Sequence, residues 1–110
     1  MPSIKTRILI VDDDERIVEV MRLTLEEEGY RVISAFNGKD GLRAAYAEQP
    51  DLILLDIMMP EMDGFRVLET LRMVTEIPII MLTAAGQDPN RIRSLDKGAT
   101  DFLPKSTPAP

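Results

Sequence analysis

RILIVDDD, at residues 7–14, is the first of two short apolar segments that end in carboxylates, and LILLD, at residues 52–56, is the second. Runs this short and this rich in Ile, Val and Leu are typical of parallel strands that are buried on both faces. In open α/β sheets, ligands bind in the crevice at the carboxyl ends of such strands. We therefore expect Asp12, Asp13 and Asp56 to meet at one edge of a sheet.

These carboxylates would repel one another at such an edge. Two unit charges about 4 Å apart repel by about 4 kcal/mol at an effective dielectric constant near 20. A cation would offset that repulsion, and Mg²⁺ usually takes one or two carboxylates, keeps several waters and bridges to a phosphoryl group. The two segments therefore predict a site for Mg²⁺ and a phosphoryl group.

Length and composition describe one small acidic domain. The chain has 110 residues, 45% of them hydrophobic, and a formal net charge of −6. It contains no cysteine and no histidine, which excludes disulfides, thiolate metal sites, zinc chemistry and imidazole catalysis. The acidic balance argues against direct nucleic acid binding. With no apolar signal core and no apolar run near the ~20 residues of a membrane span, we expect a soluble, cytoplasmic protein with no membrane partner.

Strand and helix patterns alternate along the chain. The patterns predict strands over residues 7–11, 31–35, 52–55, 79–82 and 100–103, and helices between Asp14 and Gly29 and over 39–48, 64–73 and 89–97. Since parallel crossovers are right-handed, this rhythm predicts an α/β fold with a flavodoxin-like, doubly wound, five-stranded parallel sheet in the order 2-1-3-4-5. That order makes the first and third strands neighbours.

Helical spacing also selects the side chains that face the core. They are Ile17, Val20, Met21 and Leu25 in the first helix, Leu42, Ala45 and Tyr46 in the second, and Phe65, Leu68 and Leu71 in the third. Asp14 stands immediately before the first helix, where aspartate is a favoured N-cap. We therefore expect Asp14 to cap that helix and to take no part in the metal site.

Four motifs in this order resemble those of a known family: ILIVDDD at 8–14, LLDIMMPEMDG at 54–64, MLTA at 81–84 and GATDFLPK at 98–105. The chain resembles the receiver domain of two-component response regulators. The resemblance covers residues 7–105, which leaves an N-terminal tail over 1–6 and a C-terminal tail over 106–110. It implies a phosphoprotein of phosphorelay signal transduction.

The resemblance also implies a role for each acid. Asp56 would be the phosphoacceptor, which receives the phosphoryl group from a histidine kinase or a phosphotransfer protein. Asp13 and Asp56 would ligate Mg²⁺, Asp12 would act largely through water, and the backbone carbonyl of Met58 would complete the metal site. A carboxylate is a competent nucleophile for such a transfer.

Receivers carry further contacts that match Thr83, Lys105 and Phe102. Thr83 and Lys105 would bond the new phosphoryl oxygens, and Phe102 would be a switch residue coupled to Thr83. Met58 and Ala85 occupy positions that tune hydrolysis in receivers, and neither side chain orients water, so we expect slow self-dephosphorylation. The chain would thus catalyse its own phosphorylation and slow dephosphorylation, but act mainly as a switch for an output domain or partner.

The sequence departs from the family at its end. Ser106 follows Lys105 where receivers usually have a proline with a cis bond, and a non-proline cis bond costs about 2.5–4 kcal/mol, which favours a trans peptide and a less fixed lysine. The chain then stops, with Pro108 and Pro110, where receivers begin a fifth helix. We therefore expect that helix to be missing, either because the chain is an excised fragment or because a natural short form covers the sheet as a homodimer.

Other functions fit the residues less well. Haloacid-dehalogenase-like phosphatases would use Asp12 as nucleophile and Asp14 as acid, but they need Thr or Val where Arg16 stands. Flavin- or dinucleotide-binding modules need glycines where this chain has acids. A receiver-like module that binds proteins without phosphorylation stays open as the alternative, although the intact set of acids, Thr83 and Lys105 argues against it.

Overall fold

Five parallel strands form one sheet in the order β2-β1-β3-β4-β5. The computed structural model describes residues 5–83 and 97–104, with the backbone alone for Thr83, Phe102 and Pro104. Its strands are β1 (Arg7–Val11), β2 (Arg31–Ala35), β3 (Leu52–Asp56), β4 (Ile79–Thr83) and β5 (Asp101–Pro104), and its helices are α1 (Glu15–Glu27), α2 (Gly38–Glu48) and α3 (Gly64–Arg72). The predicted doubly wound fold is confirmed. Within these described ranges, every helix is too short or too polar to cross a bilayer.

Two sequence predictions fall elsewhere in the chain. The expected helix over 89–97 lies outside the described residues except for Lys97, which is in a turn, and the predicted conformation of the peptide between Lys105 and Ser106 also lies outside them.

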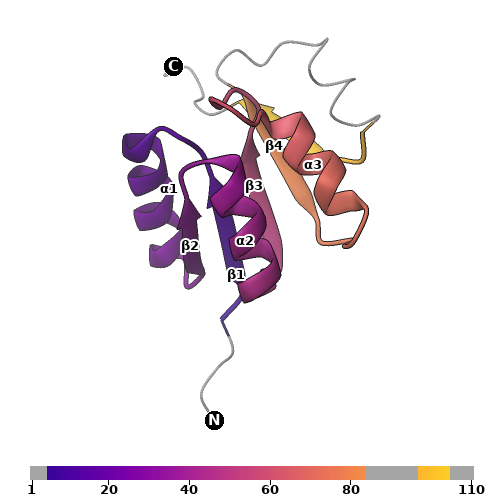
Figure 1. Ribbon diagram of the computed structural model, residues 1–110. Coiled ribbons are helices and arrows are strands. Elements are labelled where there is room, and N and C mark those ends of the chain that lie inside the picture. The colour runs from indigo at the N-terminus through magenta and orange to yellow at the C-terminus, as the bar shows by residue number, and fades with distance from the viewer. Residues whose placement is uncertain (1–4, 84–96, 105–110) are drawn as a thin grey trace.

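Successive strand residues point to opposite faces of the sheet, which divides the core in two. On one face, residues such as Leu9, Val11, Ile53 and Leu55 pack with α2 and α3, which lie in front of the sheet in Figure 1. On the other face, a smaller cluster packs around Val18 of α1; its buried members are Ile8, Ile10, Val18, Leu54 and Leu82. Burial on both faces explains why these strands are continuous apolar runs.

Helix α1 turns a different set of residues to the sheet from the predicted one. The prediction that Val20 faces the core is wrong, because its side chain is 64% exposed and Val18 is buried instead. Ile17, Val18, Met21 and Leu25 make one stripe at about 100° per residue, and Val20 falls beyond its edge. The sheet therefore selects a single stripe from a helix with apolar residues on more than one side.

Helix α2 lies close to the sheet through small residues. Gly38, Gly41 and Ala45 are its buried positions, and a Cβ built at Gly41 would lie 2.8 Å from Cγ1 of Val11. Tyr46 lies about 100° around the helix from Ala45 and is exposed, so the prediction that Tyr46 faces the core is wrong. The missing side chain at Gly41 brings α2 against the strand that leads into Asp12.

Asp14 caps α1, as predicted. Its Oδ1 accepts hydrogen bonds from the backbone N–H groups of Arg16 at 3.0 Å and Ile17 at 3.3 Å. The first turn of a helix has no intrahelical partners for these donors. Asp14 is therefore engaged with the helix that follows β1.

Replacing Asp14 tests this cap. We expect Asp14→Ala to lower the free energy of unfolding by about 1 kcal/mol, because two backbone donors lose their acceptor. Asp14→Asn is the matched control, since asparagine keeps the capping oxygen and removes the charge. Urea unfolding followed by circular dichroism measures both variants. An equal loss in Asp14→Asn would show that charge, and not the hydrogen bonds, is what Asp14 contributes.

Candidate functional site

Asp12 and Asp13 follow directly on β1 at the carboxyl edge of the sheet. The backbone N–H of Asp12 donates to the carbonyl of Ala35 at 3.1 Å, which continues the pairing with β2. Oδ1 of Asp12 accepts from the backbone N–H of Asp14 at 2.9 Å. These bonds hold Asp12 in the interior, where it is 0% exposed, while Asp13 faces the solvent.

Asp56 is the last residue of β3 rather than the first residue after it. The predicted strand ends at Leu55, but the ladder with β4 runs one residue further and pairs Asp56 with Leu82. The next N–H, that of Ile57, donates to the carbonyl of Leu82 at 3.1 Å. Strand geometry on both sides of this position thus fixes the backbone that carries Asp56, whose side chain is 1% exposed.

Gly64 holds the other side of the Asp56 peptide. Its N–H donates to the carbonyl of Ile57 at 2.8 Å, and a Cβ at this position would lie only 2.1 Å from the carbonyl oxygen of Asp56. Asp63 caps α3 by accepting from the N–H of Arg66 at 3.0 Å. The sequence did not predict the close approach of Gly64 to the carbonyl oxygen of Asp56. The one signal of this close approach in the sequence is that glycine, a poor helix former, stands at the first position of a predicted helix.

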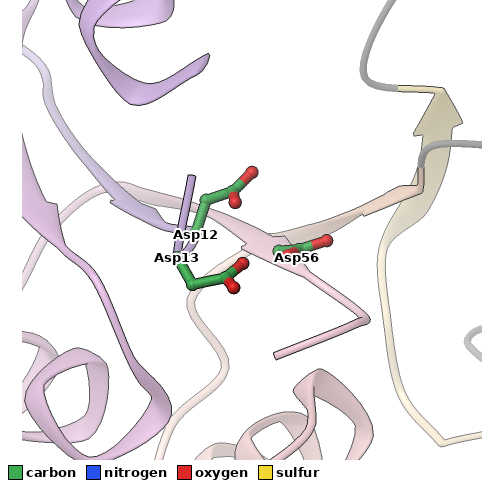
Figure 2. Close-up of side chains that lie close together, drawn as sticks. All are labelled: Asp12, Asp13 and Asp56. Atoms are coloured by element: carbon green, nitrogen blue, oxygen red, sulfur yellow. The ribbon is translucent and has the colours of Figure 1, made fainter. Parts of the chain in front are cut away.

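The structure brings Asp12, Asp13 and Asp56 together. Each offers a carboxylate oxygen, and these oxygens all lie within 4.8 Å of one another. Figure 2 shows the side chains of Asp12 and Asp13 beside that of Asp56, at the ends of two neighbouring strands. Two unit charges at such a distance repel by about 3.5 kcal/mol at an effective dielectric constant of 20. Hard oxygen donors at this spacing are suitable ligands for a divalent cation such as Mg²⁺.

Three of the remaining predicted site residues, Met58, Thr83 and Phe102, are among the residues that the structure describes. Met58 is in the loop after β3, with its side chain 73% exposed. Thr83 ends β4, one residue after Leu82, the register partner of Asp56, and Thr83 itself pairs with Pro104 of β5. Phe102 lies in β5, paired with Met81. Lys105 and Ala85 lie outside the described residues.

Comparison with known proteins identifies relatives that match most of the chain. The family model for the response regulator receiver domain matches residues 8–109. The DNA-binding dual master transcriptional regulator RpaA of Synechocystis sp. is 46% identical over 102 residues, which are 90% of this chain and 42% of RpaA. The probable transcriptional regulator ycf27 of Guillardia theta is 42% identical over 101 residues, which are 92% of this chain and 40% of that protein. The chain thus spans about two fifths of the length of these curated relatives.

Solved structures show the same likeness. The BeF3-activated N-terminal receiver domain of Klebsiella pneumoniae RstA superposes with a TM-score of 0.89 at 35% identity, and the match covers 94% of this chain and 88% of that one. The N-terminal domain of a response regulator receiver protein from Methanoculleus marisnigri gives a TM-score of 0.84 at 42% identity, covering 92% and 85%. With its three carboxylates at one sheet edge, this chain belongs to the response regulator receiver domain family.

Proposed function

We propose that Asp56 is the phosphoacceptor of this receiver domain. A carboxylate oxygen of Asp56 attacks the phosphorus of a phosphohistidine on a histidine kinase or phosphotransfer protein. The bond between phosphorus and nitrogen breaks, its electron pair stays on the imidazole, and an aspartyl phosphate forms. The observation that carries this proposal is the gathering of three carboxylate oxygens within 4.8 Å around a strand end that two backbone ladders fix.

The acid cluster would hold Mg²⁺. Asp13 and Asp56 would be direct ligands with the backbone carbonyl of Met58, and Asp12 would act through water; the exposure of Asp13 and the burial of Asp12 fit this division. Bound Mg²⁺ supplies positive charge that neutralises the carboxylates and the incoming phosphoryl oxygens. The chain's own part is to fix the donors before the phosphoryl group arrives.

The phosphoryl contacts would come from the ends of β4 and β5. The hydroxyl of Thr83 and the ammonium of Lys105 would bond the oxygens of the new phosphate, and charge-assisted bonds of this kind are roughly twice as strong as neutral ones. The register of β4 supports this role for Thr83, since it stands one residue beyond the partner of Asp56. Such contacts favour one state of a two-state equilibrium, in which Phe102 would be the switch residue.

The wider protein would place this domain in a cytoplasmic phosphorelay. Its matched relatives are longer transcriptional regulators, which supports an output domain or partner protein controlled by residues 7–105, with 1–6 and 106–110 as tails. A homodimer is one form that such a switch would take. Contact with nucleic acid would belong to the output segment, because the chain carries a net charge of −6.

Phosphorylation on Asp56 is the first test. Incubation with acetyl phosphate and Mg²⁺ should add one phosphoryl group to the unaltered chain, and intact mass spectrometry detects it. Asp56→Asn should add none, because the nucleophile is gone. Asp63→Asn is the matched control; its amide keeps the cap of α3, so this variant should react like the unaltered chain. A phosphoryl group on Asp56→Asn would place the acceptor elsewhere.

Magnesium binding is the second test. At about ten times its dissociation constant, Mg²⁺ should raise the free energy of unfolding by about 1.4 kcal/mol. Asp13→Asn should unfold at higher urea without Mg²⁺, because one repelling charge is removed, and should lose most of the gain from Mg²⁺. Asp14→Asn should keep that gain, since Asp14 serves the helix. Sodium chloride of equal ionic strength separates binding from screening, and a full gain in Asp13→Asn would contradict this metal site.

The lifetime of the phosphoryl group is the third test. We expect the aspartyl phosphate to persist well beyond seconds, because Met58 presents no group that orients water. Met58→Asn should speed its loss, by less than the roughly hundredfold that a positioned base supplies. Met73→Asn replaces another exposed methionine, at the end of α3, and should leave the rate unchanged. Loss within seconds in the unaltered chain would sink this expectation.

A further inference from the structure

Arg72, at the end of α3, directs its side chain to backbone carbonyls of two separate segments. Its Nε donates to the carbonyl of Gly98 at 2.6 Å, and its Nη1 donates to the carbonyls of Ile77 at 2.8 Å and Thr75 at 3.4 Å. Burial lowers the pKa of the guanidinium, and the charge of Glu76 opposes this shift. The partly buried guanidinium thus ties the loop before β4 to the turn before β5.

The turn before β5 is shaped to receive this side chain. Gly98 has a φ of +106°, and a Cβ there would lie 2.9 Å from Cγ of Arg72. The aliphatic part of Arg72 therefore lies against a residue that has neither the space nor the backbone conformation for a side chain. One residue earlier, Lys97 forms an ion pair with Glu69, so α3 contacts this turn twice.

This turn sets where β5 begins. After it, Ala99 is buried in the core, and Thr100 engages the first residue of β4: its N–H donates to the carbonyl of Ile79 at 2.8 Å, and its Oγ1 accepts from the N–H of Ile79 at 3.2 Å. The ladder then pairs Ile80 with Asp101 and runs on to the pair of Thr83 with Pro104. A slip of one residue would move the far end of β5 by about 3.3 Å and reverse its side chains.

We propose that Arg72 is a positioning residue for the phosphoryl site. It holds the turn at Gly98 against α3, and thereby fixes the register on β4 of β5, the strand that Lys105 directly follows in the sequence. Arg72 binds the turn at the start of β5, whereas Asp56 stands at the carboxyl edge of the sheet. Arg72 would therefore act on the site through β5. The part of this inference that concerns Lys105 rests on the proposed function; the part that concerns the register of β5 does not.

Arg72→Met tests the register directly, because methionine keeps an unbranched stem over Gly98 and removes the donors. Amide hydrogen exchange of Thr100 and Phe102, whose N–H groups face β4, should speed up by about tenfold or more, since hydrogen bonds to a charged group are lost. Arg66→Met, on the exposed side of the same helix, should leave exchange unchanged. Arg72→Lys, with one cationic donor group, should fall between the two. Unchanged exchange at β5 in Arg72→Met overturns the proposal.

The reaction gives the second readout. Displacement by about 1 Å can cost a reaction up to a hundredfold, so we expect Arg72→Met to react with acetyl phosphate about fivefold to tenfold more slowly. The gain in stability that Arg72→Met takes from Mg²⁺ should be unchanged, because Asp12 and Asp13 directly follow β1 and Asp56 ends β3.

A double-mutant cycle separates positioning from general damage. In a Lys105→Ala background, Arg72→Met should slow the reaction by less than about twofold, because the group that it positions is gone. An equal slowing in both backgrounds would overturn the link to Lys105. If the unaltered chain takes up no phosphoryl group, the proposed function fails, and hydrogen exchange alone still decides whether Arg72 holds β5.

Discussion

The repulsion among three carboxylates at one sheet edge is the constraint on which the rest of the site depends. The pairing of Val11 with Leu55 aligns β1 and β3, so that Asp12 and Asp56 stand side by side, with oxygens of the cluster within 4.8 Å. The acids cannot move apart without moving strands that are buried on both faces. The core therefore holds a cluster of negative charge in place, and that cluster favours any state in which a cation joins it.

Much of the fold could be predicted because burial leaves a mark in the sequence. The strands over 7–11 and 31–35 and the third helix begin where the patterns place them, since an apolar run or a helical stripe is the condition for burial itself. The same patterns fail at Val20 and Tyr46. Both are apolar residues that lie beside the buried stripe of their helix. The period alone does not show which side of a helix packs on the sheet. In α2 that side is the one with Gly38 and Gly41, where the helix comes closest to its neighbours.

The candidate site divides in the same way. The acids could be found because they stand at the ends of apolar runs, and the ends of such runs are visible in the sequence. The contacts of Gly64 and Arg72 could not be predicted, because their partners are backbone carbonyls, which every residue carries. An arginine in the last turn of an amphipathic helix is typical of a solvated residue, and only the fold shows that Arg72 binds the turn at Gly98. A hydrogen bond from Arg72 to a backbone carbonyl 26 residues further along the chain has no counterpart in the composition or in the hydrophobic periodicity of the sequence.

The two halves of the proposed site differ in how their strands are held. β1 and β3 each pair with a strand on both sides, so the positions of the acids are fixed twice over. β5 is at the end of the sheet as described, and its ladder joins it to β4 alone. An edge strand has fewer hydrogen bonds to set its register, so a second constraint has more effect there than in the centre. The contacts of α3 with Lys97 and Gly98 lie where that constraint is needed: at the start of the strand, before the first residue of the ladder.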